Sequence, residues 1–273
     1  MDGTHFQARG AEQLASFVAE ELAAGGVPFI DANSPTADDA LPQISLFIAG
    51  DSTVMTYKED AAPMQGWGQQ IASFLRDEVT VNNQALGGRS TRTFVYGNVT
   101  CDDGRVAYNG GTPDKSGTRW ERIEQQISAG DFCLIQFGHN DAGSVCERHV
   151  EVPEYQQNLQ AMVRAVRARG ATPILITPMS QLSYRNGVFT ATLQSYATAM
   201  LEVGRDEQVE TVDLNTLSVD LYQRLGYDTV SSQLFMPAET THFQREGAIA
   251  MARLVSEALA AAGGPLAPYV TLD

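Results

Sequence analysis

Short apolar runs alternate with longer amphipathic runs along most of the chain. The apolar runs predict β-strands at 44–49, 79–83, 131–136, 172–177 and 209–213. The amphipathic runs predict helices at 66–77, 117–128, 153–169, 190–204, 215–225 and 244–262. Because strands that alternate with helices form βαβ units, we expect an α/β fold in which a parallel five-stranded sheet lies between two layers of helices.

Another amphipathic run, at residues 6–24, precedes this pattern and predicts an N-terminal helix that Gly25-Gly26 and Pro28 would end. The polar, proline-bearing residues that follow are typical of a linker. We therefore divide the chain into an N-terminal helical segment (1–30), a linker (31–43) and one domain (44–273).

The two ends of the chain repeat each other. Residues 4–28 and 241–265 share 14 identities in 25 ungapped positions, and both copies begin with Thr-His-Phe-Gln. We interpret the N-terminal copy as the remnant of a preceding domain or as the product of a circular permutation. The apolar side chains along one face of this extra helix have to be buried. We therefore expect the helix to pack elsewhere on the chain or across a homodimer with exchanged terminal helices.

The net charge of −15 argues against nucleic acid and anionic membranes as partners, because an acidic surface attracts neither. No apolar run approaches the roughly 18 residues that span a bilayer, and no signal peptide is visible, so we expect a cytoplasmic protein. Cys133 lies in an apolar run and should be buried. A disulfide between Cys101 and Cys146 is an open alternative, but a reducing compartment is the simpler interpretation.

Polar motifs follow the first three predicted strands: Gly50-Asp51-Ser52, then residues 84–90, then Gly138-His139-Asn140-Asp141. The carboxyl ends of parallel strands meet at one edge of a sheet, so these motifs should converge there. A serine at such an edge becomes a nucleophile when a histidine takes its proton, a third group orients the histidine, and N–H donors hold the oxyanion. Each motif alone is equally well explained as a turn or a cap, and their occurrence together in this order is what favours catalysis.

The motifs resemble the sequence blocks of the GDSL/SGNH hydrolase superfamily. Gly50-Asp51-Ser52-Thr53 resembles the nucleophile block, residues 83–90 resemble the block that carries the oxyanion glycine, here Gly88, and residues 136–141 resemble the block that carries the oxyanion asparagine, here Asn140. Trp67, between two glycines, is typical of the rhamnogalacturonan acetylesterase-like branch. The resemblance covers residues 44–263 and implies a three-layer, flavodoxin-like α/β/α fold.

The last block of the family is Asp-x-x-His, and this chain departs from it. The C-terminal copy reads Glu239-Thr-Thr-His242, whereas the N-terminal copy, Asp2-Gly3-Thr4-His5, keeps the family pattern. An extended linker could bring His5 and Asp2 to the serine of the same chain or of a neighbour. We favour Glu239 and His242, because they are joined directly to the domain and because glutamate also orients the histidine in some triads.

The resemblance implies a serine esterase in which Ser52, His242 and Glu239 are catalytic. The oxyanion would be held by the N–H groups of Ser52 and Gly88 and by the Asn140 side chain. The implied substrate is an O-acetylated fragment of a plant cell-wall polysaccharide, pectic first and xylan second, cleaved through an acetyl-enzyme without a cofactor or metal.

Trp67, Arg89 and Arg92 lie near the motifs and could stack on a sugar or contact a uronate, although each is equally well explained as structural. His139 and His149 lack the ligand spacing of a metal site. Two alternatives stay open: an esterase acting on acetylxylan or on small acyl groups, and a non-catalytic carbohydrate-binding domain, which the change from Asp to Glu in the last block would permit. A nucleotide-binding domain is disfavoured because the glycine-rich phosphate-binding motifs are missing.

Overall fold

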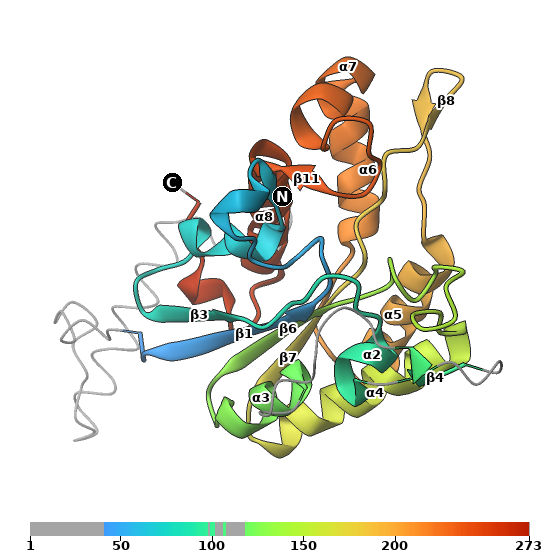
Figure 1. The fold of residues 1–273 in the computed structure, drawn as a ribbon. Helices are drawn as coiled ribbons and strands as arrows, with labels where there is room; N and C mark the ends of the chain where they lie inside the picture. Colours follow the sequence, from blue (N-terminus) through green and yellow to red (C-terminus); the bar gives the residue numbers. More distant parts are fainter. Residues whose placement is uncertain (1–40, 98, 102–105, 108–117, 273) are drawn as a thin grey trace, which may run out of the picture. The chain divides into compact units, whose positions relative to one another are not determined.

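The computed structural model describes residues 41–97, 99–101, 106–107 and 118–272 (Figure 1). The expected N-terminal helix and nearly all of the linker lie outside these residues, so the division of the chain at residues 30 and 43 stays a prediction. The same holds for the packing of the N-terminal copy.

Five parallel strands form the central sheet. β1 (Ile44–Gly50) lies between β3 (Val79–Asn83) and β6 (Phe132–Gln136), and β7 (Thr172–Ile176) and β10 (Thr211–Val212) complete the order β10-β7-β6-β1-β3. The expected parallel, flavodoxin-like α/β sheet is therefore confirmed. The strand order reverses at β1, and ligands of such sheets bind beside the carboxyl ends of the strands at this point.

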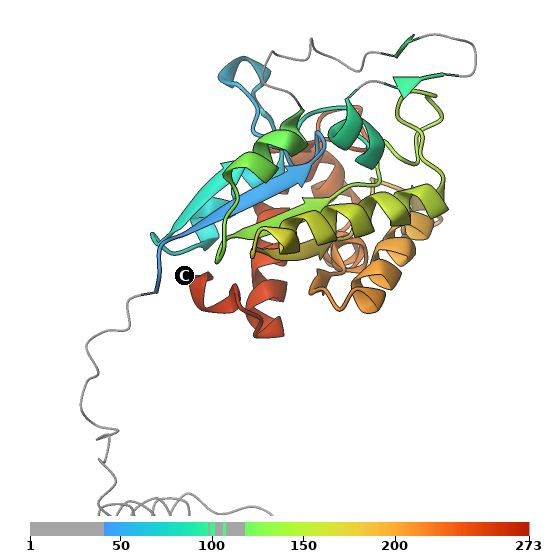
Figure 2. The ribbon, with the colours of Figure 1, turned by 90° about the horizontal axis from the view of Figure 1, so that it is seen from below.

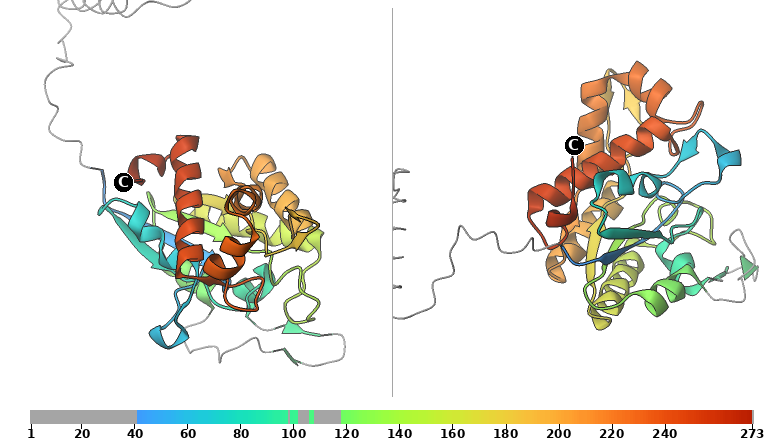
Figure 3. Two further views of the ribbon diagram at one scale, coloured as in Figure 1. Left: turned by 90° about the horizontal axis from the view of Figure 1, so that it is seen from above. Right: turned by 90° about the vertical axis from the view of Figure 1, so that its left-hand side faces the viewer.

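Side chains of β1 alternate between two apolar cores, one on each face of the sheet. Leu46 and Ile48 join the core beneath α6 (Leu214–Leu225) and α8 (Arg245–Ala262), whereas Phe47 and Ala49 join the core beneath the helices that lie between residues 91 and 206. Figure 2 and the right-hand view of Figure 3 show the two helical layers with the sheet between them. Burial on both faces explains why the strands are continuous apolar runs in the sequence.

Most of the predicted helices are confirmed within a few residues: α3 (Arg119–Gln126), α4 (Val152–Ala168), α5 (Gln194–Asp206), α6 (Leu214–Leu225) and α8 (Arg245–Ala262). Shorter elements connect them: β2 (Met64–Gln65) with β11 (Phe243–Gln244), β4 (Val99–Thr100) with β5 (Val106–Ala107), β8 (Tyr184–Arg185) with β9 (Val188–Phe189), α7 (Tyr227–Thr229), η1 (Glu59–Ala61), η4 (Val230–Leu234) and η5 (Ala267–Tyr269). No helix of the described residues is long and apolar enough to cross a membrane.

Two local predictions are wrong. The helix expected at 66–77 is instead two short 3₁₀ turns, η2 (Trp67–Gln69) and η3 (Ile71–Phe74), because the buried Trp67 turns inward and donates its indole N–H to Gln136. The helix α2 (Thr91–Tyr96) was not predicted, although the Ser90 side chain caps it by accepting the N–H of Thr93.

Cys101 and Cys146 form a disulfide, with their Cα atoms 6.0 Å apart, while Cys133 is buried and unpaired as expected. The pairing that the sequence left open is therefore present. The compartment expected from the sequence stays a prediction. The bond also fastens the loop between β6 and α4 to the segment that follows α2.

Candidate active site

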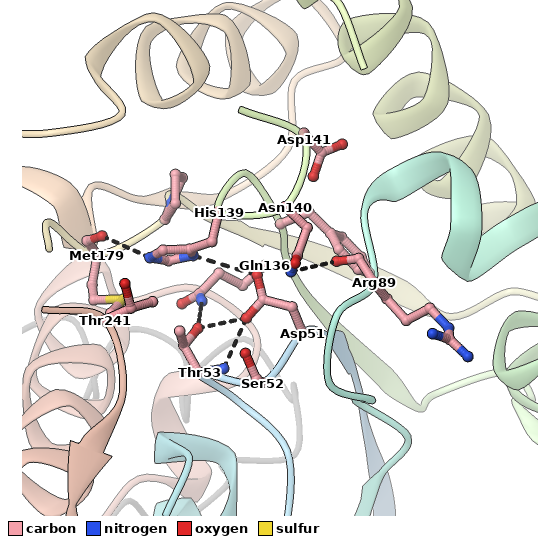
Figure 4. Close-up of polar contacts among 12 residues, drawn as sticks. Asp51, Ser52, Thr53, Arg89, Gln136, His139, Asn140, Asp141, Met179 and Thr241 are labelled. Atoms are coloured by element: carbon pink, nitrogen blue, oxygen red, sulfur yellow. Dashed lines mark hydrogen bonds and ion pairs between the residues drawn. The ribbon is translucent and has the colours of Figure 1, made fainter. Parts of the chain in front are cut away.

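The serine turn at the end of β1 is fixed by buried hydrogen bonds. The Asp51 side chain accepts hydrogen bonds from the N–H and the hydroxyl of Thr53, at 2.8 and 2.7 Å. The Thr53 hydroxyl in turn accepts the side-chain amide of Gln136, at the end of β6, at 2.8 Å, and Gln136 accepts the Trp67 indole at 2.8 Å. This chain of bonds holds Ser52 at the carboxyl ends of β1 and β6 (Figure 4).

His242 lies between Ser52 and Glu239. Its Nε2 is 3.0 Å from the Ser52 hydroxyl, and its Nδ1 is 2.5 Å from Glu239 Oε2. A carboxylate only accepts, so Nδ1 carries the proton and Nε2 is left to accept the serine hydroxyl. The loop that carries the pair is closed on itself, because the N–H of Met236 donates to the carbonyl of His242 at 2.9 Å. This is the arrangement in which a serine can lose its proton to a histidine.

Glycines allow two further loops to approach the serine. Gly87 lies beside the nucleophile, where a Cβ would be 3.7 Å from the Cβ of Ser52, an ordinary contact, and 3.3 Å from Met55 Sδ. Gly88 and Gly138 have φ angles of 72° and 138°, and a Cβ on Gly138 would lie 2.7 Å from Pro178 Cγ. Glycine is therefore favoured at Gly88 by backbone conformation and at Gly138 by backbone conformation and close contact.

The Asn140 side-chain amide is held at both ends. Its Nδ2 donates to the carbonyl of Arg89 at 3.0 Å, and its Oδ1 accepts from Arg148 Nη1 at 3.3 Å. These two contacts assign the orientation of the amide, and the second N–H of Nδ2 is available for a ligand oxygen. Asn140 lines the cavity at Ser52 together with Gly88, so donors and nucleophile face the same space.

That cavity has a volume of about 700 Å³. The five residues expected to carry out the chemistry all contribute to its wall: Ser52, Gly88, Asn140, Glu239 and His242. The structure therefore brings together in one place the residues that the sequence motifs selected.

The family model of the GDSL-like Lipase/Acylhydrolase family matches residues 48–250. The chain belongs to this family. It is 35% identical to a probable rhamnogalacturonan acetylesterase, YesY, of Bacillus subtilis over 81% of this chain and 94% of that protein. It is 32% identical to the rhamnogalacturonan acetylesterase RhgT of the same organism over 83% of this chain and 94% of that protein.

Solved structures agree with the family membership. The crystal structure of YxiM from Bacillus subtilis has a TM-score of 0.68 and 28% identity, and the alignment covers 82% of this chain and 58% of that one. An acetylxylan esterase, Axe2, from Geobacillus stearothermophilus has a TM-score of 0.55 and 15% identity over 80% of this chain and 92% of that one. At 15% identity, the second comparison establishes a common fold alone.

His139 lies beneath the nucleophile of this GDSL-like protein and is not part of the serine–histidine pair. Its Nε2 is 3.1 Å from the carbonyl of Met179, and its Nδ1 is 3.4 Å from the second oxygen of the Asp51 carboxylate (Figure 4). Burial alone would raise the pKa of Asp51, but His139 and the hydrogen bonds from Thr53 outweigh it and lower that pKa. The sequence places His139 in the third motif, but it does not indicate that His139 contacts the Asp51 carboxylate.

Asp141 links the second and third motifs. One of its oxygens accepts the N–H and the hydroxyl of Thr91 at 2.9 and 2.6 Å, which anchors the first turn of α2. The carboxyl is fully buried, and burial raises its pKa to about 7, although the bonds from Thr91 oppose this effect.

We expect Asp141→Asn to flatten the dependence of stability on pH. The folded state binds the Asp141 proton more tightly than the unfolded chain, so the stability that this proton provides is complete below about pH 4 and is lost as the pH rises through 7. Each unit of raised pKa corresponds to about 1.4 kcal/mol. Urea unfolding from pH 4 to 8 measures the slope, with Asp228→Asn on the exposed α7 as the control. An Asp141→Asn protein with the slope of the wild type would contradict this account.

Three residues that the sequence suggested as sugar contacts do not line the cavity. Trp67 is fully buried, and Arg92 donates to the carbonyls of Cys146 and His149. The Arg89 side chain leads away from Ser52 in Figure 4, while its carbonyl accepts the Asn140 side-chain amide. Arg148, which the motifs did not indicate, lines the cavity instead. Within the described parts of the chain, no group of three or more His, Cys, Asp or Glu side chains could hold a metal ion.

Proposed function

We propose that this protein is a serine esterase that removes O-acetyl groups from pectic polysaccharide fragments of the rhamnogalacturonan type. One observation carries the proposal: His242 contacts the Ser52 hydroxyl through Nε2 and Glu239 through Nδ1. Membership of the GDSL-like family and the names of the relatives make a carboxylic ester hydrolase, and specifically a carbohydrate acetylesterase, the function that fits this geometry.

In the first half of the reaction, His242 Nε2 takes the proton of Ser52 as Oγ attacks the acetyl carbonyl carbon. The oxyanion that forms would be held by the N–H groups of Ser52 and Gly88 and by the second N–H of Asn140 Nδ2. Glu239 stabilises the imidazolium. When the tetrahedral intermediate collapses, the C–O bond to the sugar breaks and the sugar oxygen leaves with the proton from His242.

In the second half, a water molecule gives its proton to His242 and attacks the acetyl-enzyme. The ester bond to Ser52 breaks, Oγ recovers its proton, and acetate leaves. The protons exchanged among Ser52, the leaving sugar and the attacking water all pass through His242 Nε2, and the product acetic acid ionises to acetate by giving its proton to solvent.

The pectic substrate is favoured over xylan by the sequence relatives, which are named rhamnogalacturonan acetylesterases. The acetylxylan esterase among the solved structures shares the fold only. The non-catalytic alternative rested on the change from aspartate to glutamate at position 239. The longer glutamate side chain nevertheless contacts His242, so this change does not argue against catalysis.

The test is acetate release from acetylated rhamnogalacturonan, acetylxylan and p-nitrophenyl acetate. We expect turnover of all three by the wild type, the highest kcat/KM on the pectic substrate, and loss of turnover in Ser52→Ala. A serine-directed fluorophosphonate should label the wild type and not this variant. Equal rates for wild type and Ser52→Ala on every ester, together with no labelling, would leave a binding domain as the better account.

A further inference from the structure

Arg148 supplies a positive charge to the wall of the cavity at Ser52. Within the described residues, no carboxylate lies within ion-pair distance of it; its side chain contacts Asn140 Oδ1 at 3.3 Å. The carboxylate of the same wall, Glu239, is already engaged by His242. Arg148 therefore contributes a positive charge to the cavity wall that no carboxylate of the described residues neutralises, and an anionic ligand in the cavity could bind it.

The backbone around Arg148 is held in place. The N–H groups of Arg148 and His149 donate to the carbonyl of Val145, both at 2.9 Å. Arg92 donates to the carbonyls of Cys146 and His149, and the disulfide ties Cys146 to Cys101. Because the backbone of this loop is already constrained, little backbone entropy is lost when the Arg148 guanidinium binds a ligand.

A guanidinium carries five N–H donors in a planar fork that matches a carboxylate. Asn140 uses one of these donors of Arg148, which leaves others for a second acceptor on the cavity side. Asn140 is also the expected oxyanion donor, so an acceptor bound by Arg148 would lie beside the reacting acetyl group.

The negative net charge of the chain makes the Arg148 guanidinium important for binding an anionic substrate. A chain with a net charge of −15 repels an anionic polysaccharide, and a local positive charge in the cavity offsets that repulsion where the substrate binds. A neutral substrate such as acetylxylan has no need of such a charge, whereas a uronate does.

We propose that Arg148 is a specificity-determining residue that binds the carboxylate of a uronic acid adjacent to the acetylated position. This inference rests on the proposed esterase function, which it deepens by assigning the discrimination between acidic and neutral chains to one side chain.

The test compares acetylated oligogalacturonate with the same oligosaccharide after methyl esterification of its carboxylates. We expect Arg148→Gln to lose about 10- to 100-fold in kcat/KM on the acidic form, the loss of one charge-assisted hydrogen-bonded contact. On the methyl ester and on p-nitrophenyl acetate the loss should be clearly smaller, because there the variant loses only the contact with Asn140 Oδ1. Arg148→Lys should recover part of the preference, and salt should weaken the preference of the wild type more than that of Arg148→Gln.

Arg205→Gln is the matched control, because it removes the same charge from an exposed site at the end of α5. It should leave the preference for the acidic form unchanged. Thermal unfolding of each variant separates loss of recognition from loss of the fold. An equal loss on acidic and neutral substrates would overturn the inference, because Arg148 would then act through Asn140, and so would no loss on either.

Calorimetric binding of unacetylated oligogalacturonate to Ser52→Ala, with and without Arg148→Gln, distinguishes this inference from the proposed function. Weaker binding after removal of Arg148 would support the inference even if the wild type released no acetate. Acetate release with equal binding to both proteins would keep the esterase and remove Arg148 from substrate recognition.

Discussion

Replacement of His242 with alanine is expected to lower kcat for acetate release by roughly 10⁴- to 10⁶-fold, as loss of the base does in serine hydrolases. The reason is geometric: Nε2 is the atom within 3.0 Å of the Ser52 hydroxyl that can take its proton. KM should change much less, because the imidazole acts on the proton and not on the sugar. Steady-state kinetics on acetylated rhamnogalacturonan and p-nitrophenyl acetate measures both quantities.

His5→Ala is the matched control, because His5 stands in the N-terminal copy of the same Thr-His-Phe-Gln segment. We expect this variant to keep the activity of the wild type. The reverse pattern, with an active His242→Ala and an inactive His5→Ala, would mean that the N-terminal copy of the same chain or of a neighbour provides the base. Mixing the inactive His5→Ala protein with the inactive Ser52→Ala protein would then reveal an exchange between chains, because activity returns only if one chain supplies the histidine to the serine of another.

Replacement of Glu239 with glutamine is expected to lower kcat by about 10⁴-fold, the loss seen when the carboxylate of a triad becomes an amide. The carboxylate fixes the proton on His242 Nδ1 and stabilises the imidazolium, whereas a glutamine can present an N–H to Nδ1 and select the wrong tautomer. The measurement is kcat on acetylated rhamnogalacturonan and on p-nitrophenyl acetate.

Glu239→Asp is the informative companion, because it restores the residue type of the family block. The shorter side chain withdraws the carboxylate from Nδ1 by about one carbon–carbon bond, so we expect activity between that of the wild type and that of Glu239→Gln. If Glu239→Gln retains more than a tenth of the wild-type kcat, the carboxylate that orients the base must be sought elsewhere, with Asp2 as the first candidate.

The sheet was predictable because its strands are buried on both faces. Leu46, Phe47 and Ile48 form an apolar run whether each side chain points to one core or to the other, and such a run bounded by turn residues indicates a central strand. The region 66–77 was mispredicted, because the indole of Trp67 bonds to Gln136, a residue 69 positions away. No local pattern contains that contact.

The site was partly predictable for a related reason. Ser52, Gly88 and Asn140 each follow a strand, so the sheet alone brings their loops together. Arg148 lies on a loop whose path depends on the disulfide and on the hydrogen bonds from Arg92, and no periodicity marks such a residue. Turn and loop chemistry of this kind is visible only once the long-range contacts are known.

The hydrogen bond between Ser52 and His242 joins residues 190 positions apart. During synthesis the first strand, its serine and both oxyanion loops leave the ribosome long before the segment that carries the histidine. With His242 as the proposed base, a nascent chain would hold an unactivated serine until its last helix, α8, is released and packs against the sheet. Ester hydrolysis would then become possible only when the fold is complete, so turnover would report on completed folding and not merely on the presence of the polypeptide.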